Sequence, residues 1–265
     1  MLKNFDPAVT FLGGQSFLWE KRGDIYVLTE KDKCFVAKED GKGVKVRAVL
    51  GDGEDIKSYF GSARKRALAL KRLKKDKFLK RAIDALPGLY LLKQDFESVF
   101  LSFILSSNNS ILRIRRSAQC LKESFGKSIA TDLGEVKLFP GAERLSNASL
   151  KDLKACGLGY RAEFLKASAK DFAKDKDELE NLRGLELVEA LKNFKGVGDK
   201  VADCIAVFSG KADTFSPIDT HAKRILSELY ELEFKKYNDY RKWFTERFGK
   251  DAALAGQFLF EYYRN

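Results

Sequence analysis

Two residues in the last third of the chain, Lys200 and Asp219, are the side chains best suited to carry out a reaction. Lys200 follows Gly196-Val197-Gly198-Asp199, and Asp219 follows Pro217-Ile218 19 residues later. An uncharged lysine amine can act as a nucleophile, and a carboxylate can stabilise a developing positive charge. Each also has a simpler interpretation, because Lys200 could bind a phosphate and Asp219 could be the N-cap of a helix beginning at Thr220.

The residues around Lys200 predict a helix-hairpin-helix. Apolar residues at helical spacing predict helices over 185–194 and 201–208, with Gly196-Val197-Gly198 between them. Glycines in such a turn let the backbone approach a partner closely, and the free N–H groups at the start of the second helix suit a phosphate. Helical hairpins also form for packing reasons alone, so this one does not by itself establish DNA binding.

The secondary structure that must position these residues is predicted to change from strands to helices near residue 55. Before it, segments 24–29, 34–37 and 44–49 are rich in strand-forming residues and predict an antiparallel meander. From Asp55 to the end the apolar period is helical, so the fold class is α+β. Besides the two helices around Lys200, we predict helices over 96–104, 111–125, 150–156, 160–174, 220–230, 237–248 and 252–262.

The composition is that of a globular and strongly basic protein. Of the 265 residues, 45% are hydrophobic, and an excess of basic over acidic residues gives a net charge of +11. This charge favours a polyanionic partner, although a lysine-rich surface is an alternative explanation. The apolar runs are too short to cross a membrane and the N-terminus lacks a secretion signal, so we expect a cytoplasmic protein, associated with the nucleoid if prokaryotic, with no membrane partner.

Two further features concern cysteines and local charge. The four cysteines, at positions 34, 120, 156 and 204, are too widely spaced for metal-binding pairs, and the chain has one histidine. We therefore expect no metal and reduced, mostly buried thiols. Residues 64–81 hold ten basic residues against one acid, which predicts a basic helical segment that either contacts phosphates or presents a solvated face.

Five motifs, in order along the chain, resemble those of the 8-oxoguanine DNA glycosylase/lyase family within the helix-hairpin-helix DNA glycosylase superfamily. They are Gly14-Gln15-Ser16-Phe17 followed by Trp19, and the segments 106–114, 157–162, 196–204 and 217–221. The resemblance runs nearly end to end. It implies an N-terminal twisted antiparallel sheet domain with the basic helical segment (1–95) and a helical domain with a DNA-intruding loop and a wedge (96–190). A third unit would hold the helix-hairpin-helix, the catalytic Asp loop and C-terminal helices that pack back on the core (191–265).

The resemblance also implies a bifunctional enzyme of base excision repair, with hydrolase and AP lyase activities. Asp219 would stabilise positive charge on the sugar as the glycosidic bond breaks, and Lys200 would attack the anomeric carbon, form a Schiff base and permit β-elimination of the 3′ phosphate. The damaged base would be flipped out of the duplex. By resemblance, Cys204 and Phe260 would sandwich it, and the carbonyl of Gly14 would accept the N7 hydrogen that guanine lacks.

Other residues would contact the DNA around the flipped base. The resemblance implies that Asn108 enters the gap, that Tyr160 wedges beside the opposite base, and that Arg113 and Arg161 read the estranged cytosine. His221 would contact a phosphate, as would the hairpin backbone at Gly196 and Gly198. A monovalent cation at the hairpin carbonyls would be consistent with the resemblance, and no redox or organic cofactor is implied. We expect a monomer whose partner is double-stranded DNA containing a damaged base.

One position departs from the family pattern. Gly256 occupies the place where a base-contacting glutamine is usual, and Gln257 follows one residue later, roughly 100° around a helix. Either the helix shifts or another group reads the base edge. The departure leaves open the alternative hypothesis that the protein is a glycosylase for another oxidised or alkylated purine. A noncatalytic helix-hairpin-helix DNA-binding protein is a third hypothesis, and it would require neither Lys200 nor Asp219.

Overall fold

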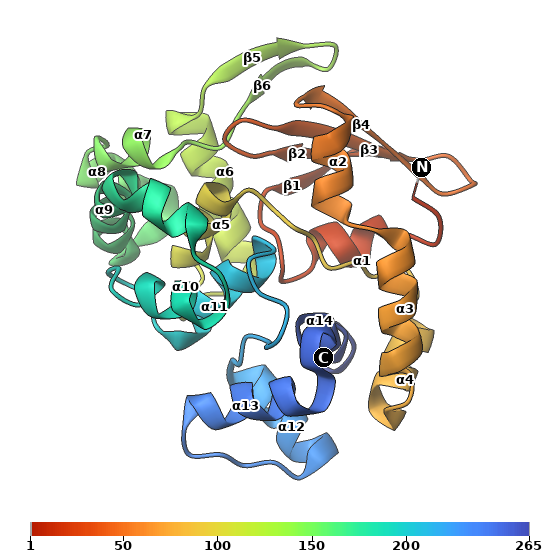
Figure 1. Ribbon diagram of the computed structural model, residues 1–265. Coiled ribbons are helices and arrows are strands. Elements are labelled where there is room, and N and C mark those ends of the chain that lie inside the picture. Colours follow the sequence, from red (N-terminus) through yellow and green to blue (C-terminus); the bar gives the residue numbers. More distant parts are fainter. Residues whose placement is uncertain (1, 265) are drawn as a thin grey trace.

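The computed structural model describes residues 2–264, and an antiparallel four-stranded sheet lies near the N-terminus (Figure 1). Its strands β1 (Trp19–Arg22), β2 (Ile25–Thr29), β3 (Cys34–Glu39) and β4 (Val44–Leu50) follow one another in sequence order. The predicted meander is confirmed. Strand β1 was not predicted, because three of its four residues are charged and only Trp19 is buried.

Helices form most of the remaining chain, which confirms the α+β class (Figure 1). None of them, within residues 2–264, is long and apolar enough to cross a membrane. They are α1 (Pro7–Leu12), α2 (Gly53–Phe60), α3 (Ala63–Leu73), α4 (Lys77–Ala85), α5 (Phe96–Ile104), α6 (Ile111–Phe125), α7 (Ala142–Ser146), α8 (Leu150–Leu153), η1 (Lys154–Leu158), α9 (Arg161–Asn181), α10 (Gly184–Leu191), α11 (Asp199–Phe208), α12 (Thr220–Tyr230), α13 (Tyr237–Phe248), η2 (Gly249–Asp251) and α14 (Ala252–Tyr263).

The prediction that the chain is helical from Asp55 to its end was wrong at one place. A short hairpin, β5 (Ser128–Thr131) and β6 (Gly134–Lys137), follows α6 and lies beside the N-terminal sheet (Figure 1). Val136 of β6 packs in one apolar cluster with Val27 and Val36 of the sheet. A hairpin of this length gains most of its stability from such packing. Its sequence alone therefore gives little signal.

The basic segment forms two helices, where one helical segment had been predicted. The chain leaves α3 after Leu73, and Asp76 then caps α4 by accepting the backbone N–H groups of Phe78 and Leu79. The buried faces of both helices share a hydrophobic cluster with α12, α13 and α14. Two of the segment's arginines have structural partners, because Arg66 donates to the carbonyls of Pro87 and Leu89 and Arg72 is paired with Asp251.

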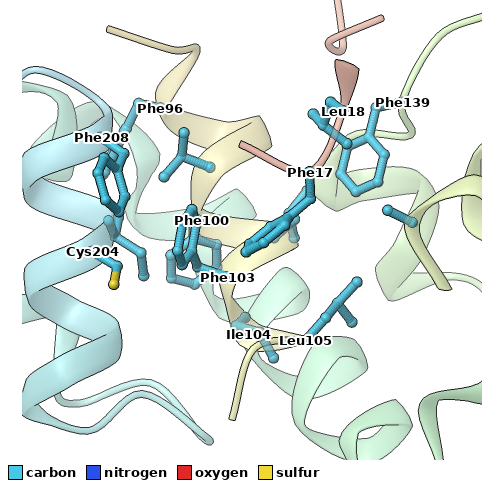
Figure 2. Close-up of a cluster of buried hydrophobic side chains, with 14 of the residues drawn as sticks. Phe17, Leu18, Phe96, Phe100, Phe103, Ile104, Leu105, Phe139, Cys204 and Phe208 are labelled. Atoms are coloured by element: carbon cyan, nitrogen blue, oxygen red, sulfur yellow. The ribbon is translucent and has the colours of Figure 1, made fainter. Parts of the chain in front are cut away.

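The hydrophobic interior has two main parts. The larger part joins the sheet to α5, α6 and α9–α11, and the smaller part joins α3 and α4 to the C-terminal helices. Within the larger part, Phe103 of α5 packs against Phe17 and Phe208, at ring-centroid distances of 4.8 and 5.3 Å. Figure 2 shows Cys204 of α11 at the edge of these aromatic rings. The domain boundaries at residues 95 and 190 stay predictions.

The prediction that all four cysteines are reduced was wrong. Cys120 of α6 and Cys156 of η1 form a disulfide, whereas Cys34 and Cys204 are free and buried. The two half-cystines are 36 residues apart in sequence, and only the packing of α6 against η1 brings them together. The bond links the helix that carries Arg113 to the segment that leads into Tyr160.

Candidate active site

The predicted helix-hairpin-helix is formed by α10, a turn at 192–198 and α11. Gly196 has a φ of 86°, and a Cβ built there would lie 2.6 Å from the ring of Phe164, so both backbone conformation and space require glycine. Gly198 is the N-cap of α11 and is exposed, and no side chain caps this helix. Its first N–H groups are therefore available to a ligand, as the hypothesis of phosphate binding requires.

Lys200 lies in the first turn of α11, half-buried, and its Nζ is 3.5 Å from the hydroxyl oxygen of Ser106. Asp219 is the N-cap of α12, where Oδ1 accepts the backbone N–H of Ala222 at 2.8 Å. The N-cap interpretation of Asp219 thus describes a real contact. Both side chains also line two adjacent pockets, one smaller and one larger, so capping and chemistry are compatible roles for Asp219.

The smaller pocket, which we call the base pocket, brings together residues from both ends of the chain. It lies where the two parts of the hydrophobic interior meet, and its walls come from the loop after α1, from α11, from the segment before α12, and from α12, α13 and α14. The base pocket includes Gly14, Lys200, Cys204, Asp219, Gln257 and Phe260, which are all the residues predicted to contact the base or carry out catalysis. Their roles stay predictions, but their convergence is a finding of the structure.

Cys204 and Phe260 give the base pocket apolar walls. Cys204 is buried in α11, and burial raises the pKa of its thiol to about 12, so it is uncharged at neutral pH. Phe260 lies against Gly14, where a Cβ would come within 2.8 Å of the ring carbon Cε1. Any larger residue at position 14 would push this ring. The predicted sandwich of a flat base between Cys204 and Phe260 is consistent with these contacts.

The structure explains the departure at Gly256. A Cβ at this position would lie 1.8 Å from Oγ and 2.4 Å from Cβ of the buried Ser216, so no glutamine fits there. Gln257 also lines the base pocket, and its amide nitrogen donates to Glu261 at 3.1 Å. The pocket thus has a glutamine, one residue later than in the family pattern. Whether Gln257 reads the base stays a prediction.

The larger pocket, which we call the DNA cleft, lies beside the base pocket and shares Lys200 and Asp219 with it. Asn108 lies in this cleft, exposed and with a φ of 46°, a left-handed conformation that asparagine tolerates better than most residues. His221 is also in the cleft and exposed. The rest of its wall is formed by Ser106, Ser107, Asn109, Gly198, Asp199, Val201, Ile218, Thr220, Lys223 and Tyr237.

The residues predicted to act on the opposite strand lie near this cleft. Tyr160 is 51% exposed, and its ring is stacked by the guanidinium of Arg161. Arg161 donates to the carbonyls of Ser107 and Asn108, so it holds the loop that carries Asn108 in place. Arg113 is exposed in the first turn of α6. These bonds use Nε and Nη2 of Arg161, so Nη1, which makes no hydrogen bond among the described residues, could donate to a cytosine without their loss.

The hairpin carbonyls allow a test of the monovalent cation. The carbonyl of Lys195 accepts the hydroxyl of Ser168 at 2.7 Å, and that of Gly196 accepts the hydroxyl of Ser107 at 3.3 Å. Each carbonyl oxygen has a second lone pair, so a cation could bind these carbonyls beside the hydroxyls or use other carbonyl oxygens of the turn. The monovalent cation stays a prediction. Within residues 2–264, no three His, Cys, Asp or Glu side chains gather in a way that could hold a metal.

Sequence reasoning missed the buried network that joins α11 to the segment carrying Asp219. Asp203, in the turn after Lys200, is fully buried and binds the guanidinium of Arg241 and the hydroxyl of Tyr237. That hydroxyl accepts the backbone N–H of Ile218, the residue before Asp219. A buried charge requires such partners. An aspartate among apolar residues of a predicted helix was the available signal, but it did not identify the partners.

Solved structures with the same fold act on DNA bases. The chain superposes on the 8-oxoguanine glycosylase/lyase of Clostridium acetobutylicum in its apo-form with a TM-score of 0.88 and 30% identity, covering 98% of this chain and 94% of that one. The same enzyme in complex with double-stranded DNA containing cytosine opposite 8-oxoguanine also gives a TM-score of 0.88. Fold and site together define a helix-hairpin-helix DNA glycosylase.

Sequence comparisons agree with this class. The family model described as HhH-GPD superfamily base excision DNA repair protein matches residues 101–250, more than half of the chain. The N-glycosylase/DNA lyase of Saccharomyces cerevisiae is 28% identical, over 84% of this chain and 68% of that protein. The N-glycosylase/DNA lyase OGG1 of Arabidopsis thaliana is 32% identical over 66% of this chain, which spans about half of that protein. The chain belongs to the HhH-GPD superfamily and, within it, to the family of 8-oxoguanine glycosylase/lyases, which confirms the resemblance.

Proposed function

We propose that this protein flips 8-oxoguanine out of duplex DNA, excises it and cleaves the DNA backbone at the resulting site, in base excision repair. The observation that carries the proposal is that Gly14, Lys200, Cys204, Asp219, Gln257 and Phe260 line one pocket beside a cleft. The family and the relatives' names support it. Its substrate would place the enzyme with the chromosomal DNA.

In the proposed mechanism, the glycosidic bond between C1′ and N9 breaks and its electron pair leaves with the base, which takes up a proton. Asp219 stabilises the positive charge that develops on the sugar. The amine of Lys200 bonds to C1′, the sugar ring opens to a Schiff base, and O4′ becomes a hydroxyl. Loss of a proton from C2′ then expels the 3′ phosphate by β-elimination. Half-burial of Lys200 beside Cys204, Phe103 and Ser106 keeps its amine next to the pocket.

The first experiment is borohydride trapping with a duplex that carries one 8-oxoguanine opposite cytosine. Borohydride reduces a Schiff base to a stable amine, so we expect a covalent adduct with the damaged duplex and none with an undamaged one. Lys200→Gln should abolish the adduct. Lys174→Gln is the matched control, because Lys174 lies in α9 outside both pockets and is 65% exposed. An adduct that persists in Lys200→Gln would refute the assignment of the nucleophile.

The second experiment separates the two roles of Asp219. Asparagine is as good an N-cap as aspartate and can still accept the N–H of Ala222. Asp219→Asn should therefore keep the thermal stability, but excision should fall about 10²- to 10³-fold because the charge is lost. Unchanged excision would leave Asp219 with the capping role alone. A wild-type protein that binds duplex DNA without excision or adduct would favour the noncatalytic hypothesis.

A further inference from the structure

The loop that carries Gly14 is pressed against α14 through two adjacent glycines. A Cβ at Gly13 would lie 2.3 Å from Oε1 of Glu261, and one at Gly14 would lie 2.8 Å from the ring of Phe260. Neither glycine has a positive φ, so the requirement is for space and not for an unusual backbone conformation. The loop therefore packs on two successive side chains of α14, and one of them is a carboxylate.

Glu261 binds two groups of the base pocket with one oxygen. Its Oε1 accepts the backbone N–H of Gly14 at 2.9 Å and the amide nitrogen of Gln257 at 3.1 Å. Gln257 precedes Glu261 by four residues, so both side chains lie on one face of α14. A carboxylate only accepts hydrogen bonds, which fixes the amide of Gln257 with its nitrogen toward Glu261. The carbonyl oxygen is then the acceptor that the side chain of Gln257 can offer to a base.

The carboxylate is held in a charged environment away from water. The side chain of Glu261 is 3% exposed, and its burial raises its pKa. Arg264 lies 3.3 Å from Oε2, and Arg115 of α6 adds positive charge nearby. Arg115 also fixes the same loop, because its guanidinium donates to the carbonyls of Phe11, Gly13, Ser16 and Trp19 at 2.7–3.3 Å. The loop is thus clamped on both sides of Gly14.

We infer that Glu261 is a positioning residue that sets the specificity of the base pocket for guanine-type purines. It fixes the main chain at Gly14 and turns the carbonyl of Gln257 toward the base. A guanine-type edge presents donors at N1 and at its amino group, which suit an acceptor, whereas an adenine-type edge presents an acceptor at N1. This inference rests on the proposed function, because it concerns the base that the same pocket accepts.

The test compares three duplex substrates in single-turnover reactions: 8-oxoguanine opposite cytosine, 8-oxoadenine at the same position, and a preformed abasic site. In Glu261→Ala we expect excision of 8-oxoguanine to fall about 10- to 100-fold, because the loop and the amide lose their fixed positions. The preference of the variant for 8-oxoguanine over 8-oxoadenine should also fall. Cleavage at the abasic site needs Lys200 but no base recognition, so it should stay within about twofold of wild type.

Two further variants sharpen the result. Glu261→Gln keeps an acceptor for the N–H of Gly14, so it should restore part of the excision rate. Glu246→Ala is the matched control, since Glu246 of α13 is 66% exposed and paired only with Lys242 among the ion pairs of the described chain, and it should behave as wild type. Thermal melting of each variant verifies folding.

Two results for Glu261→Ala would overturn the inference. The first is that the variant excises 8-oxoguanine at the wild-type rate with an unchanged preference over 8-oxoadenine. The second is that the rates of 8-oxoguanine excision and of abasic-site cleavage fall by the same factor. The second result would mean that Glu261 supports the fold and not recognition. Failure of the proposed function would be visible earlier and separately, as a wild-type protein that does not excise 8-oxoguanine. In that case both the proposed function and the inference about Glu261 would be wrong.

Discussion

The hydroxyl of Tyr237 connects the segments that carry Lys200 and Asp219. It donates to Oδ2 of Asp203 at 2.8 Å and accepts the backbone N–H of Ile218 at 2.9 Å. Burial raises the pKa of Tyr237, so the hydroxyl keeps its proton and both bonds. Tyr237→Phe removes this connection and leaves the ring in place. We expect the variant to fold, with lower stability and with Asp219 less well fixed relative to Lys200.

The magnitude follows from the two lost bonds. An unpaired N–H of the buried Ile218 costs about 1–3 kcal/mol, and a hydrogen bond to a charged group contributes about 1.5–3 kcal/mol. Arg241 still binds Asp203 and compensates in part. We therefore expect the free energy of unfolding to fall by roughly 2–4 kcal/mol. A shift of about 1 Å between catalytic groups can lower the rate on the order of 100-fold.

The assay combines urea denaturation with single-turnover excision of 8-oxoguanine. Tyr240→Phe is the matched control, because Tyr240 is buried on the same helix and its hydroxyl accepts the backbone N–H of Phe234 at 3.2 Å, away from Asp203. Both variants should lose stability, but only Tyr237→Phe should lose most of its activity. Equal activity losses in the two variants, or full activity in Tyr237→Phe, would refute the reasoning.

Two further predictions concern stability. Burial raises the pKa of Glu30 well above 4.5, so the unfolded state loses this proton first and stability falls as pH rises from about 4.5 toward the folded-state pKa. Glu30→Gln should remove the contribution of Glu30 to this decline, which Asp95, Asp203 and Glu261 share, and raise the free energy of unfolding at neutral pH. The increase should be about 1.4 kcal/mol for each pH unit that separates the folded-state and unfolded-state pKa values of Glu30. Urea titrations across pH measure this effect, and an equal or steeper decline in the variant would contradict it. The Cys120–Cys156 disulfide joins residues 36 positions apart, so its reduction should lower the free energy of unfolding by ~4 kcal/mol. Urea denaturation with and without reductant measures this difference. Four titratable thiols in the unfolded, unreduced chain would contradict the disulfide.

The sequence by itself determined the elements whose signals are local. The bounds of α12 and α13 were predicted to the residue, because periodic apolar residues and a capping Asp219 act within a few positions of each other. The Gly-x-Gly turn predicted the hairpin because its signal is also local. The family resemblance then proposed which residues share a site, and the structure places the base-contacting and catalytic ones in one pocket.

Only the tertiary structure decided what depends on segments far apart in the chain. The β5–β6 hairpin needs the sheet it packs on, and the disulfide needs the contact of α6 with η1. The exclusion of a glutamine at Gly256 comes from Ser216, 40 residues earlier. The role we assign to Glu261 depends on Gly14, 247 residues away. Such contacts leave no periodicity or cap in the sequence, because their partners become neighbours only when the chain folds.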